Sequence, residues 1–380
     1  MNVAVLKESA NESRVALVPE TVARIAKAGA STVVQHDAGN RAGFDDASYR
    51  EAGATIAATA QETVANADIT VKVARPTDDE LRALPAGSIL IALLAPLGDP
   101  QYVQQLANQR ITALSMDTIP RITRAQSMDA LSSQSNIAGY KAVLLAASAL
   151  PKFFPMLTTA AGTIRPAKVL VLGAGVAGLQ AIATARRLGA IVSAYDTRAV
   201  VKEQVMSLGA TFLEIDLGTD SEGADGYAKQ LTPDQIDKQR RFMLEHIGAS
   251  DVVITTALVP GVRAPLLITE EAVKGMKPGS VIVDLAAEAG GNCALTVPGE
   301  TTVAHGVTII GQVNLAATLP NHASQLYSRN IFALLQLLIK DGQVHLDLND
   351  EVVKGAMLTH DGEIVHQPTL AALQKTGVAS

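Results

Sequence analysis

The sequence is poor in aromatic residues and in cysteine. Its 380 residues include no Trp, 6 Tyr, 6 Phe and 1 Cys. A single cysteine, Cys293, excludes an intrachain disulfide and fits a reducing compartment. The chain also lacks a basic run and an aromatic cluster, and its net charge is −6. These absences disfavour broad binding to nucleic acid.

Long apolar runs are missing as well, although 48% of the residues are hydrophobic and the mean hydropathy is +0.22. A membrane-spanning helix needs roughly 18 or more nearly uninterrupted apolar residues. The two best stretches, residues 331–339 and 142–150, contain Gln336 and Ser148 and have polar residues at their edges. We therefore expect two buried helices and no transmembrane segment. The N-terminus also lacks the pattern of a signal peptide, so we expect none.

Short β-branched runs alternate with longer amphipathic stretches, which is typical of parallel sheets covered by helices. At roughly 100–200 residues per domain, the length predicts two domains. The predicted strands of the N-terminal region are residues 3–7, 32–36, 69–73, 88–94 and 111–115, with helices at 19–28, 45–52, 78–84 and 100–109. The predicted strands of the following region are residues 168–172, 191–195, 211–214, 252–255, 281–284 and 307–310.

Two long helical patterns, residues 129–150 and 318–339, flank the second group of strands, and we expect them to link the domains. The tail predicts a hairpin from residues 357–359 and 364–365. This order predicts a discontinuous first domain and a cleft bridged by the two helices. The expected domains are residues 1–128 plus 330–380 and residues 140–320, with linking helices at 129–150 and 318–339.

A glycine-rich turn directly follows the predicted strand 168–172. The run Gly173-Ala174-Gly175-Val176-Ala177-Gly178 has the spacing GxGxxG, and a helical pattern follows it. The motif is unspecific alone, but a preceding strand and a following helix are the context of a dinucleotide-binding turn. Gly173 allows the tight turn, Gly175 lets the backbone approach a pyrophosphate, and Gly178 lets helix and strand pack closely. The fold prediction is therefore α/β, with two Rossmann-like, doubly wound parallel-sheet domains.

Asp196 ends the next predicted strand, 18 residues after Gly178. A carboxylate there suits the hydroxyls of an adenosine ribose and repels a 2′-phosphate, so the sequence predicts NAD(H) in preference to NADP(H). Arg198 keeps NADP(H) open as an alternative, because a nearby arginine can accept that phosphate. A glycine turn without a nucleotide is the other alternative.

Two loops are further candidates for ligand contact. Residues 217–231 are small, polar and rich in glycine, and a loop of this length is usually functional or disordered. Its single Tyr227 favours closure over a ligand, and the alternative is a tolerated surface insertion. Residues 255–261 follow a strand of the same sheet, at an edge where loops contact ligands. Leu258 is placed to pack on adenine or nicotinamide, unless Pro260-Gly261 forms an ordinary turn.

Residues 121–136 form a densely polar segment before the first long helical pattern. Arginine, glutamine, aspartate and serine side chains suit ribose hydroxyls, a carboxamide and a phosphate, but none is a good general base near neutral pH. A polar cap of the helix, formed by Asp129 or Ser132, explains the pattern equally well.

The segment 121–140, which contains Ser132-Ser133-Gln134-Ser135-Asn136-Ile137-Ala138-Gly139-Tyr140, resembles the NAD(H)-binding domain I, or alpha subunit, of proton-translocating nicotinamide nucleotide transhydrogenases. The resemblance covers essentially the whole chain, including Lys7-Glu8, residues 11–17, the glycine turn, the loop that contains Tyr227 and the loop 255–261. It implies that the polar segment holds the nicotinamide end of NAD(H).

The resemblance also implies the residues of the site. Catalytic roles fall on Arg121, Gln126, Asp129, Ser132 and Tyr227. Cofactor-binding roles fall on Arg121, Gln126, Asp129, Ser132, Gly173, Ala174, Gly175, Val176, Gly178, Asp196, Thr197, Arg198, Gly226 and Leu258. No metal ligand is expected.

The related alanine dehydrogenases share this fold and raise the alternative of an amino-acid dehydrogenase. In them, residues matching Arg14 and Lys72 hold the carboxylate of the keto acid. A catalytic His lies on the fourth strand of the first domain, and an Asp follows the strand that corresponds to residues 281–284. This sequence keeps Arg14 and Lys72, but residues 93–96 contain no His, and the second position matches Glu288.

The missing His favours transhydrogenation. Oxidation of an amino acid moves a proton as well as a hydride, so it requires an acid–base group near the operating pH. Direct hydride transfer between two nicotinamides requires only juxtaposition and orientation. Lys7, Arg14 and Lys72 are then expected to be structural or electrostatic.

We therefore expect an NAD(H)-binding subunit that transfers hydride from NADH to NADP⁺ on a partner subunit. The resemblance implies a homodimer at the cytoplasmic face of the inner membrane, held there by membrane-spanning partner subunits that couple the transfer to proton movement. A chain that ends at Ser380 is not expected to translocate protons alone. The alternatives are an alanine dehydrogenase-type enzyme and a non-catalytic NAD(H)-binding module.

Overall fold

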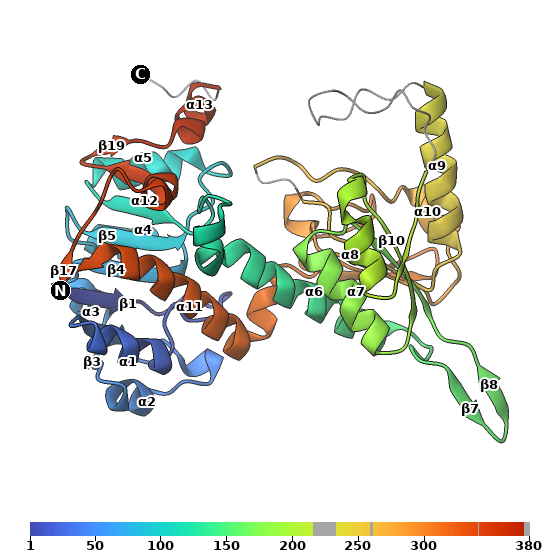
Figure 1. Cartoon of the computed structure of the whole chain (residues 1–380), viewed down its shortest axis with the longest axis horizontal. Coiled ribbons are helices and arrows are strands. Elements are labelled where there is room, and N and C mark those ends of the chain that lie inside the picture. Colours follow the sequence, from blue (N-terminus) through green and yellow to red (C-terminus); the bar gives the residue numbers. More distant parts are fainter. Residues whose placement is uncertain (216–232, 259–260, 341, 376–380) are drawn as a thin grey trace. The chain divides into compact units, whose positions relative to one another are not determined.

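The structure is a computed structural model that describes residues 1–215, 233–258, 261–340 and 342–375. The fold divides into two compact units (Figure 1). Unit 1 comprises Met1–Gln134 and Ala316–Ser380, and unit 2 comprises Ser135–Leu315. Each unit is built around its own, mostly parallel sheet, which confirms the predicted fold class.

In the described residues of unit 1, an eight-stranded sheet has the order β19-β18-β6-β5-β4-β1-β2-β3. Strands β1 to β6 run parallel, whereas β18 pairs antiparallel with β6 and with β19, which confirms the predicted hairpin. The strands are β1 (Asn2–Val5), β2 (Ser31–Gln35), β3 (Thr55–Ala57), β4 (Ile69–Ala74), β5 (Ile89–Leu93), β6 (Thr112–Ser115), β18 (Met357–His360) and β19 (Glu363–Ile364).

Both faces of this sheet are buried. Val3 and Val5 of β1 belong to one apolar core, and Ala4 between them belongs to the core on the other side. Such a strand carries apolar residues on both faces, which is why it reads as a continuous apolar run. The helices of unit 1 are α1 (Pro19–Lys27), α2 (Asp46–Glu51), α3 (Ala60–Val64), α4 (Asp78–Ala83), α5 (Pro100–Asn108), α11 (Pro320–Leu338), α12 (Glu351–Ala356) and α13 (Gln367–Lys375).

In the described residues of unit 2, a seven-stranded sheet has the order β11-β10-β9-β12-β13-β15-β14, and β14 alone runs antiparallel to its neighbour. The strands are β9 (Lys168–Leu172), β10 (Ile191–Tyr195), β11 (Thr211–Phe212), β12 (Val252–Thr255), β13 (Val281–Asp284), β14 (Thr301–Ala304) and β15 (Val307–Ile310). The helices are α6 (Ala130–Ala149), α7 (Val176–Arg187), α8 (Lys202–Ser207), α9 (Pro233–Gly248) and α10 (Glu270–Lys274). Helix α6 begins in unit 1 and continues in unit 2.

Two predicted boundaries in unit 2 were wrong. The helical pattern after the glycine turn predicts a helix over residues 179–188, but helix α7 begins at Val176, because Gly175 already ends the turn as the helix N-cap. Strand β11 ends at Phe212, two residues before the predicted end, because only Thr211 and Phe212 pair with β10.

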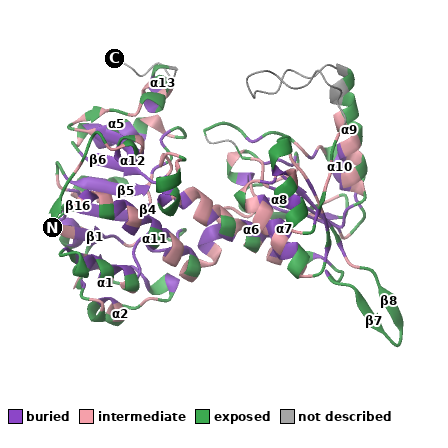
Figure 2. Ribbon diagram, viewed as in Figure 1, coloured by how far each residue is buried: buried purple, intermediate pink, exposed green. Residues whose placement is uncertain are grey.

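A further hairpin, β7 (Leu157–Thr159) with β8 (Gly162–Ile164), projects from unit 2 and is exposed along both strands (Figure 2). Sequence periodicity does not predict this hairpin, because all residues of both strands are exposed and the sequence therefore has no alternation of apolar and polar residues. Within the described residues, no helix combines the length and the apolar character that crossing a bilayer requires.

Candidate functional site

The glycine turn lies at the carboxyl end of β9 in unit 2. Gly173 has a φ of 99°, a left-handed conformation that glycine adopts without strain. A Cβ atom on Gly178 would lie 1.9 Å from the carbonyl oxygen of Gly173, so the turn itself requires the third glycine. A Cβ atom on Gly175 would meet only the Arg198 guanidinium, at 3.9 Å. The turn therefore has closely packed ends and an open middle.

The start of α7 supplies donors to that open middle. Gly175 is the N-cap, its backbone is extended, and no side chain caps the helix. The first amide groups of a helix have no partner within it, and the helix dipole adds positive charge there. Val176 is 41% exposed, so this end of α7 is accessible. The arrangement suits the pyrophosphate of a dinucleotide.

Asp196 connects this turn to the next strand. One carboxylate oxygen accepts a hydrogen bond from the amide of Ala174 at 2.7 Å and another from Nη2 of Arg198 at 2.9 Å. The other oxygen accepts from the amide and Nε of Arg198 at 2.9 and 3.0 Å. Burial alone would raise the pKa of Asp196, but the hydrogen bonds from Arg198 and Ala174 outweigh it and lower the pKa. Asp196 is thus an anion in the folded chain, and the neighbouring Thr197 is exposed.

The loop after β12 is held by a buried polar network. Asn292 donates to the carbonyl oxygen of Ala257 at 2.8 Å and accepts from the amide of Ala257 at 3.1 Å. Asp284 fixes Asn292 in turn, because it accepts a hydrogen bond from its backbone amide at 2.8 Å. Leu258 follows Ala257 and is 55% exposed. The network therefore holds the backbone beside an exposed apolar side chain at the carboxyl edge of the sheet.

In unit 1 the polar segment forms a short 3₁₀ helix, Thr123–Met128, followed by α6. Arg121 and Gln126 are exposed, and neither side chain hydrogen-bonds within the described part of the chain. Asp129 caps α6, since its two oxygens accept from the amide and the hydroxyl of Ser132 at 2.9 and 2.6 Å. The alternative of a polar helix cap is confirmed for Asp129 and not for Ser132, which is the donor, and contact of either residue with a nicotinamide stays a prediction.

Sequence reasoning missed the side chains beneath this segment. Asn330 of α11 donates to the carbonyl oxygen of Ser127 at 2.8 Å and accepts from the Ser133 hydroxyl at 2.7 Å. Gln134 donates to that same hydroxyl at 3.2 Å and accepts from Nη1 of Arg14 at 2.8 Å. Asn330 is far from Ser127 and Ser133 in the sequence, and its polar neighbours Ser328 and Arg329 leave it without a distinctive pattern.

Arg14 and Lys72, the two cations that match the alanine dehydrogenase pattern, are buried and form ion pairs with carboxylates. Arg14 donates two hydrogen bonds to the Glu12 carboxylate at 2.8 and 2.7 Å. The ammonium of Lys72 donates to both oxygens of Glu80 at 2.9 Å and lies 3.6 Å from Glu8. Burial raises the pKa of Glu8 to about 7, against the opposing effect of Lys72. Three carboxyl groups therefore surround the two cations.

The edge where an alanine dehydrogenase carries its catalytic His has a different arrangement here. The carboxylate of Asp117 accepts from the amides of Leu94 and Ala95 at 2.6 and 2.9 Å, and from the hydroxyl of Ser115 at 2.7 Å. Glu288, at the second alanine dehydrogenase position, is exposed and accepts from the amide of Asn314 at 2.6 Å. Both carboxylates thus stabilise the backbone of turns.

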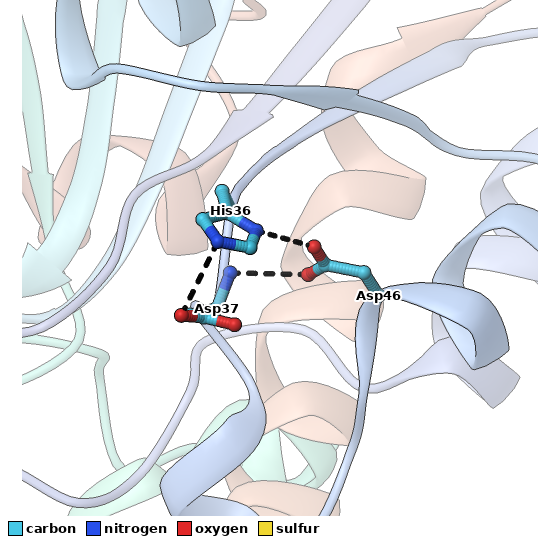
Figure 3. Close-up of side chains that lie close together, drawn as sticks. All are labelled: His36, Asp37 and Asp46. Atoms are coloured by element: carbon cyan, nitrogen blue, oxygen red, sulfur yellow. Dashed lines mark hydrogen bonds and ion pairs between the residues drawn. The ribbon is translucent and has the colours of Figure 1, made fainter.

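One group of metal-type ligands occurs in the described residues, formed by His36 and Asp37 after β2 and by Asp46 at the start of α2 (Figure 3). His36 lies between Asp37 and Asp46, with its ring nitrogens 3.4 and 2.6 Å from their carboxylates. Asp46 also accepts from the amide of Asp37, whose φ is 62°. These bonds hold a strained turn, which is a structural role for the group.

Two predicted site residues, Gly226 and Tyr227, lie with the whole loop 217–231 outside the described residues. The other predicted positions fall into two groups. One group lies in unit 2, around the glycine turn, Asp196 and Leu258, and the other lies in unit 1, at the start of α6.

Comparison with known proteins identifies the family. The model "Alanine dehydrogenase/PNT, N-terminal domain" matches residues 4–138, and the corresponding C-terminal domain matches residues 142–367. The chain is 47% identical over 356 residues to the NAD(P) transhydrogenase subunit alpha of Haemophilus influenzae, a match that covers 93% of this chain and 69% of that one. A Rhodospirillum rubrum chain, named as the first portion of such a subunit, is 47% identical over 376 residues, which cover 96% of this chain and 98% of that one.

Two solved structures have the same fold over nearly the full length. A transhydrogenase from Sinorhizobium meliloti is 42% identical, with a TM-score of 0.85, and the match covers 97% of this chain and 99% of that one. An L-alanine dehydrogenase is 25% identical, with a TM-score of 0.83, and the match covers 99% of each chain. The similarity in sequence is thus greater to the transhydrogenase than to the dehydrogenase.

Proposed function

This chain belongs to the alanine dehydrogenase/PNT family and, within it, to the NAD(P) transhydrogenase alpha subunits, and on that premise we propose that it binds NADH and passes its hydride to NADP⁺ on a partner subunit. The adenosine and pyrophosphate of NADH bind at Asp196 and at the glycine turn before α7. Arg121, Gln126, Asp129 and Ser132 orient the nicotinamide. Gly226 and Tyr227, which the family resemblance implies as further contacts of the cofactor, lie outside the described residues.

The engagement of Arg14 and Lys72 supports this function over an amino-acid dehydrogenase. A keto-acid carboxylate needs free cationic donors, but Arg14 already donates to Glu12 and Gln134, and Lys72 to Glu80. A substrate anion would also meet the charges of Glu12 and Glu80 without a compensating cation, which is costly in a buried site. Hydride transfer between two nicotinamides requires neither that anion site nor a general base.

The proposed assembly follows from the family. We propose a homodimer attached to the cytoplasmic face of the inner membrane through membrane-spanning and NADP(H)-binding partner subunits, which couple the transfer to proton movement. Pull-down of the tagged chain from detergent-solubilised membranes tests this assembly. Recovery of those subunits is expected, and recovery of the chain alone would contradict the assembly.

The activity is tested by mixing the purified chain and NADH with a partner subunit loaded with an NADP⁺ analogue. Reduction of the analogue that depends on both proteins is the expected result. Robust reduction of NAD⁺ by alanine would instead establish the dehydrogenase alternative. If the chain binds NADH but catalyses neither reaction, it is a non-catalytic NAD(H)-binding module.

A further inference from the structure

Asn330 is a buried amide in the middle of α11. It is 7% exposed, and its neighbour Ile331 belongs to the apolar core of unit 1. A buried primary amide is costly unless its donors and acceptor are satisfied. Asn330 meets this requirement through the Ser127 carbonyl at 2.8 Å and the Ser133 hydroxyl at 2.7 Å. One of these two hydrogen bonds connects Asn330 to the backbone of the polar segment.

Ser127 lies directly after Gln126 and two residues before Asp129. The Ser127 side chain is exposed, and Asn330 hydrogen-bonds to the carbonyl oxygen of Ser127. Asn330 therefore holds the backbone at Ser127 rather than a side chain. The exposed Gln126 side chain projects from the same 3₁₀ helix, Thr123–Met128. A shift of this backbone therefore moves Gln126 directly.

The side-chain amide of Asn330 is itself oriented by Ser133. The Ser133 hydroxyl donates to its oxygen, which turns the NH₂ group toward Ser127. Gln134 donates to Ser133, and Arg14, paired with Glu12, donates to Gln134. A connected polar network of this kind is rigid when all of its members are satisfied.

We propose that Asn330 is a positioning residue for hydride transfer, because it holds the Ser127 carbonyl and thereby fixes the backbone that presents Gln126 and Asp129 to the nicotinamide. The inference rests on the proposed function, since orientation of a nicotinamide matters only when hydride is transferred. A misplacement of about 1 Å at a reacting centre can reduce a rate about a hundredfold. Binding of NADH depends mainly on the adenosine and pyrophosphate groups held in unit 2, so affinity is largely independent of Asn330.

Asn330→Asp and Asn330→Ala test this role. Asp keeps an acceptor for Ser133 but places an oxygen against the Ser127 carbonyl, whereas Ala removes both contacts. Both variants should slow single-turnover hydride transfer from NADH to the partner-bound NADP⁺ analogue about tenfold or more, with the Kd for NADH changed less than about twofold. Equal losses in rate and affinity, or an unchanged rate, would overturn the inference.

Ser328→Ala is the matched control. Ser328 is a buried polar residue of the same helix, but its hydroxyl binds Thr21 and the amide of Val18, away from the polar segment. This variant loses a buried hydrogen bond of α11 and should keep the rate within about twofold of the wild type. A loss of rate equal to that of Asn330→Ala would mean that the effect comes from general destabilisation of α11, which overturns the inference.

A double-mutant cycle distinguishes positioning from a structural role. In a Gln126→Ala background, Asn330→Ala should slow transfer by a smaller factor than in the wild-type background, because one of the two side chains that it positions is already absent. Fully additive losses would overturn the proposal. Ser133→Ala removes the hydroxyl that orients Asn330, together with its bonds to Gln134 and to the Ala130 carbonyl, and leaves Asn330 itself in place. It gives the same test if the Asn330 variants unfold, since an unchanged rate there also counts against the proposal. If the wild-type pair transfers no hydride, the proposed function fails, and that result is distinct from an active wild type with an equally active Asn330→Ala.

Discussion

Asp196 and Arg198 form a bidentate ion pair at the carboxyl end of β10, with the Nε and Nη2 atoms of Arg198 3.0 and 2.9 Å from the two carboxylate oxygens. Together with the amides of Ala174 and Arg198, these donors fill the acceptor positions of a carboxylate that is 7% exposed. Arg198 is 57% exposed. A ribose hydroxyl can therefore donate to Asp196 only when the arginine releases one of its bonds.

Asp196→Asn should weaken NADH binding and reduce the discrimination against NADPH. The ribose hydroxyls lose a charged acceptor, and a 2′-phosphate no longer meets a negative carboxylate beside Arg198. We expect the Kd for NADH to rise about tenfold, which corresponds to roughly 1.4 kcal/mol, and the Kd for NADPH to fall. Fluorescence titration with both cofactors measures this. Tighter binding of NADPH than of NADH by the wild type would contradict the predicted preference.

Gly175→Ala and Gly178→Ala should separate binding from folding. The Cβ atom added at Gly175 meets only Arg198 at 3.9 Å, so the free energy of unfolding should hardly change, while the methyl group blocks the pyrophosphate. The Cβ atom added at Gly178 lies 1.9 Å from the Gly173 carbonyl oxygen and forces the turn apart. Thermal unfolding and NADH titration of both variants test this pair. Normal NADH affinity in Gly175→Ala would contradict a pyrophosphate site at the turn.

Arg14→Met should destabilise unit 1 more than the double variant Glu12→Gln/Arg14→Met. The single change leaves Glu12 buried without its cation, which typically costs about 3–5 kcal/mol, whereas the double change removes both charges. Urea denaturation gives the two free energies of unfolding. An Arg14→Met variant as stable as the wild type would mean that Glu12 does not depend on this pair.

Glu8 should make stability depend on pH. Burial raises its pKa to about 7 from the ordinary value of 4.5, so the folded state binds more protons than the unfolded state between these values. The free energy of unfolding contributed by Glu8 is therefore largest below pH 4.5 and falls as the pH rises to about 7. Glu8→Gln should flatten this decline, and denaturation curves at several pH values show whether it does. An identical pH profile in the variant would contradict the raised pKa.

Gln126→Asn and Asp129→Asn should slow hydride transfer much more than they weaken NADH binding. Gln126 is exposed, and an Asn at position 129 can still cap α6, so neither change should disturb the fold. What they alter is the orientation of the nicotinamide, an interaction that acts on the rate. Parallel losses in rate and affinity would assign these residues to binding instead.

Much of the sheet architecture could be predicted, because a buried parallel strand has a clear pattern. Val169 and Val171 of β9 face one core and Leu170 and Leu172 face the other, so the strand reads as an unbroken apolar run and its bounds agree with the prediction. The antiparallel edge strand Thr301–Ala304 has no such run, since its side chains are exposed or half-buried. Edge strands depend on pairing across space rather than on a local pattern.

The site was only partly predictable for a related reason. The glycine turn is a local feature, because Gly173, Gly175 and Gly178 lie within six consecutive residues. Their spacing alone therefore predicts the conformation of the turn. The support under the polar segment is not local, because Asn330 and Ser127 are 203 positions apart. No periodicity marks such a pair, so only the folded chain shows that it exists.

The most direct test of the account is the fate of deuterium that replaces both hydrogens at C4 of NADH. The labelled cofactor is bound to the chain and mixed with the partner subunit carrying NADP⁺, and the NADPH formed is analysed by mass spectrometry. We predict that deuterium passes to NADPH in a single turnover, with none exchanged with water. NADPH without the label, or oxidation of NADH without formation of NADPH, would contradict direct hydride transfer.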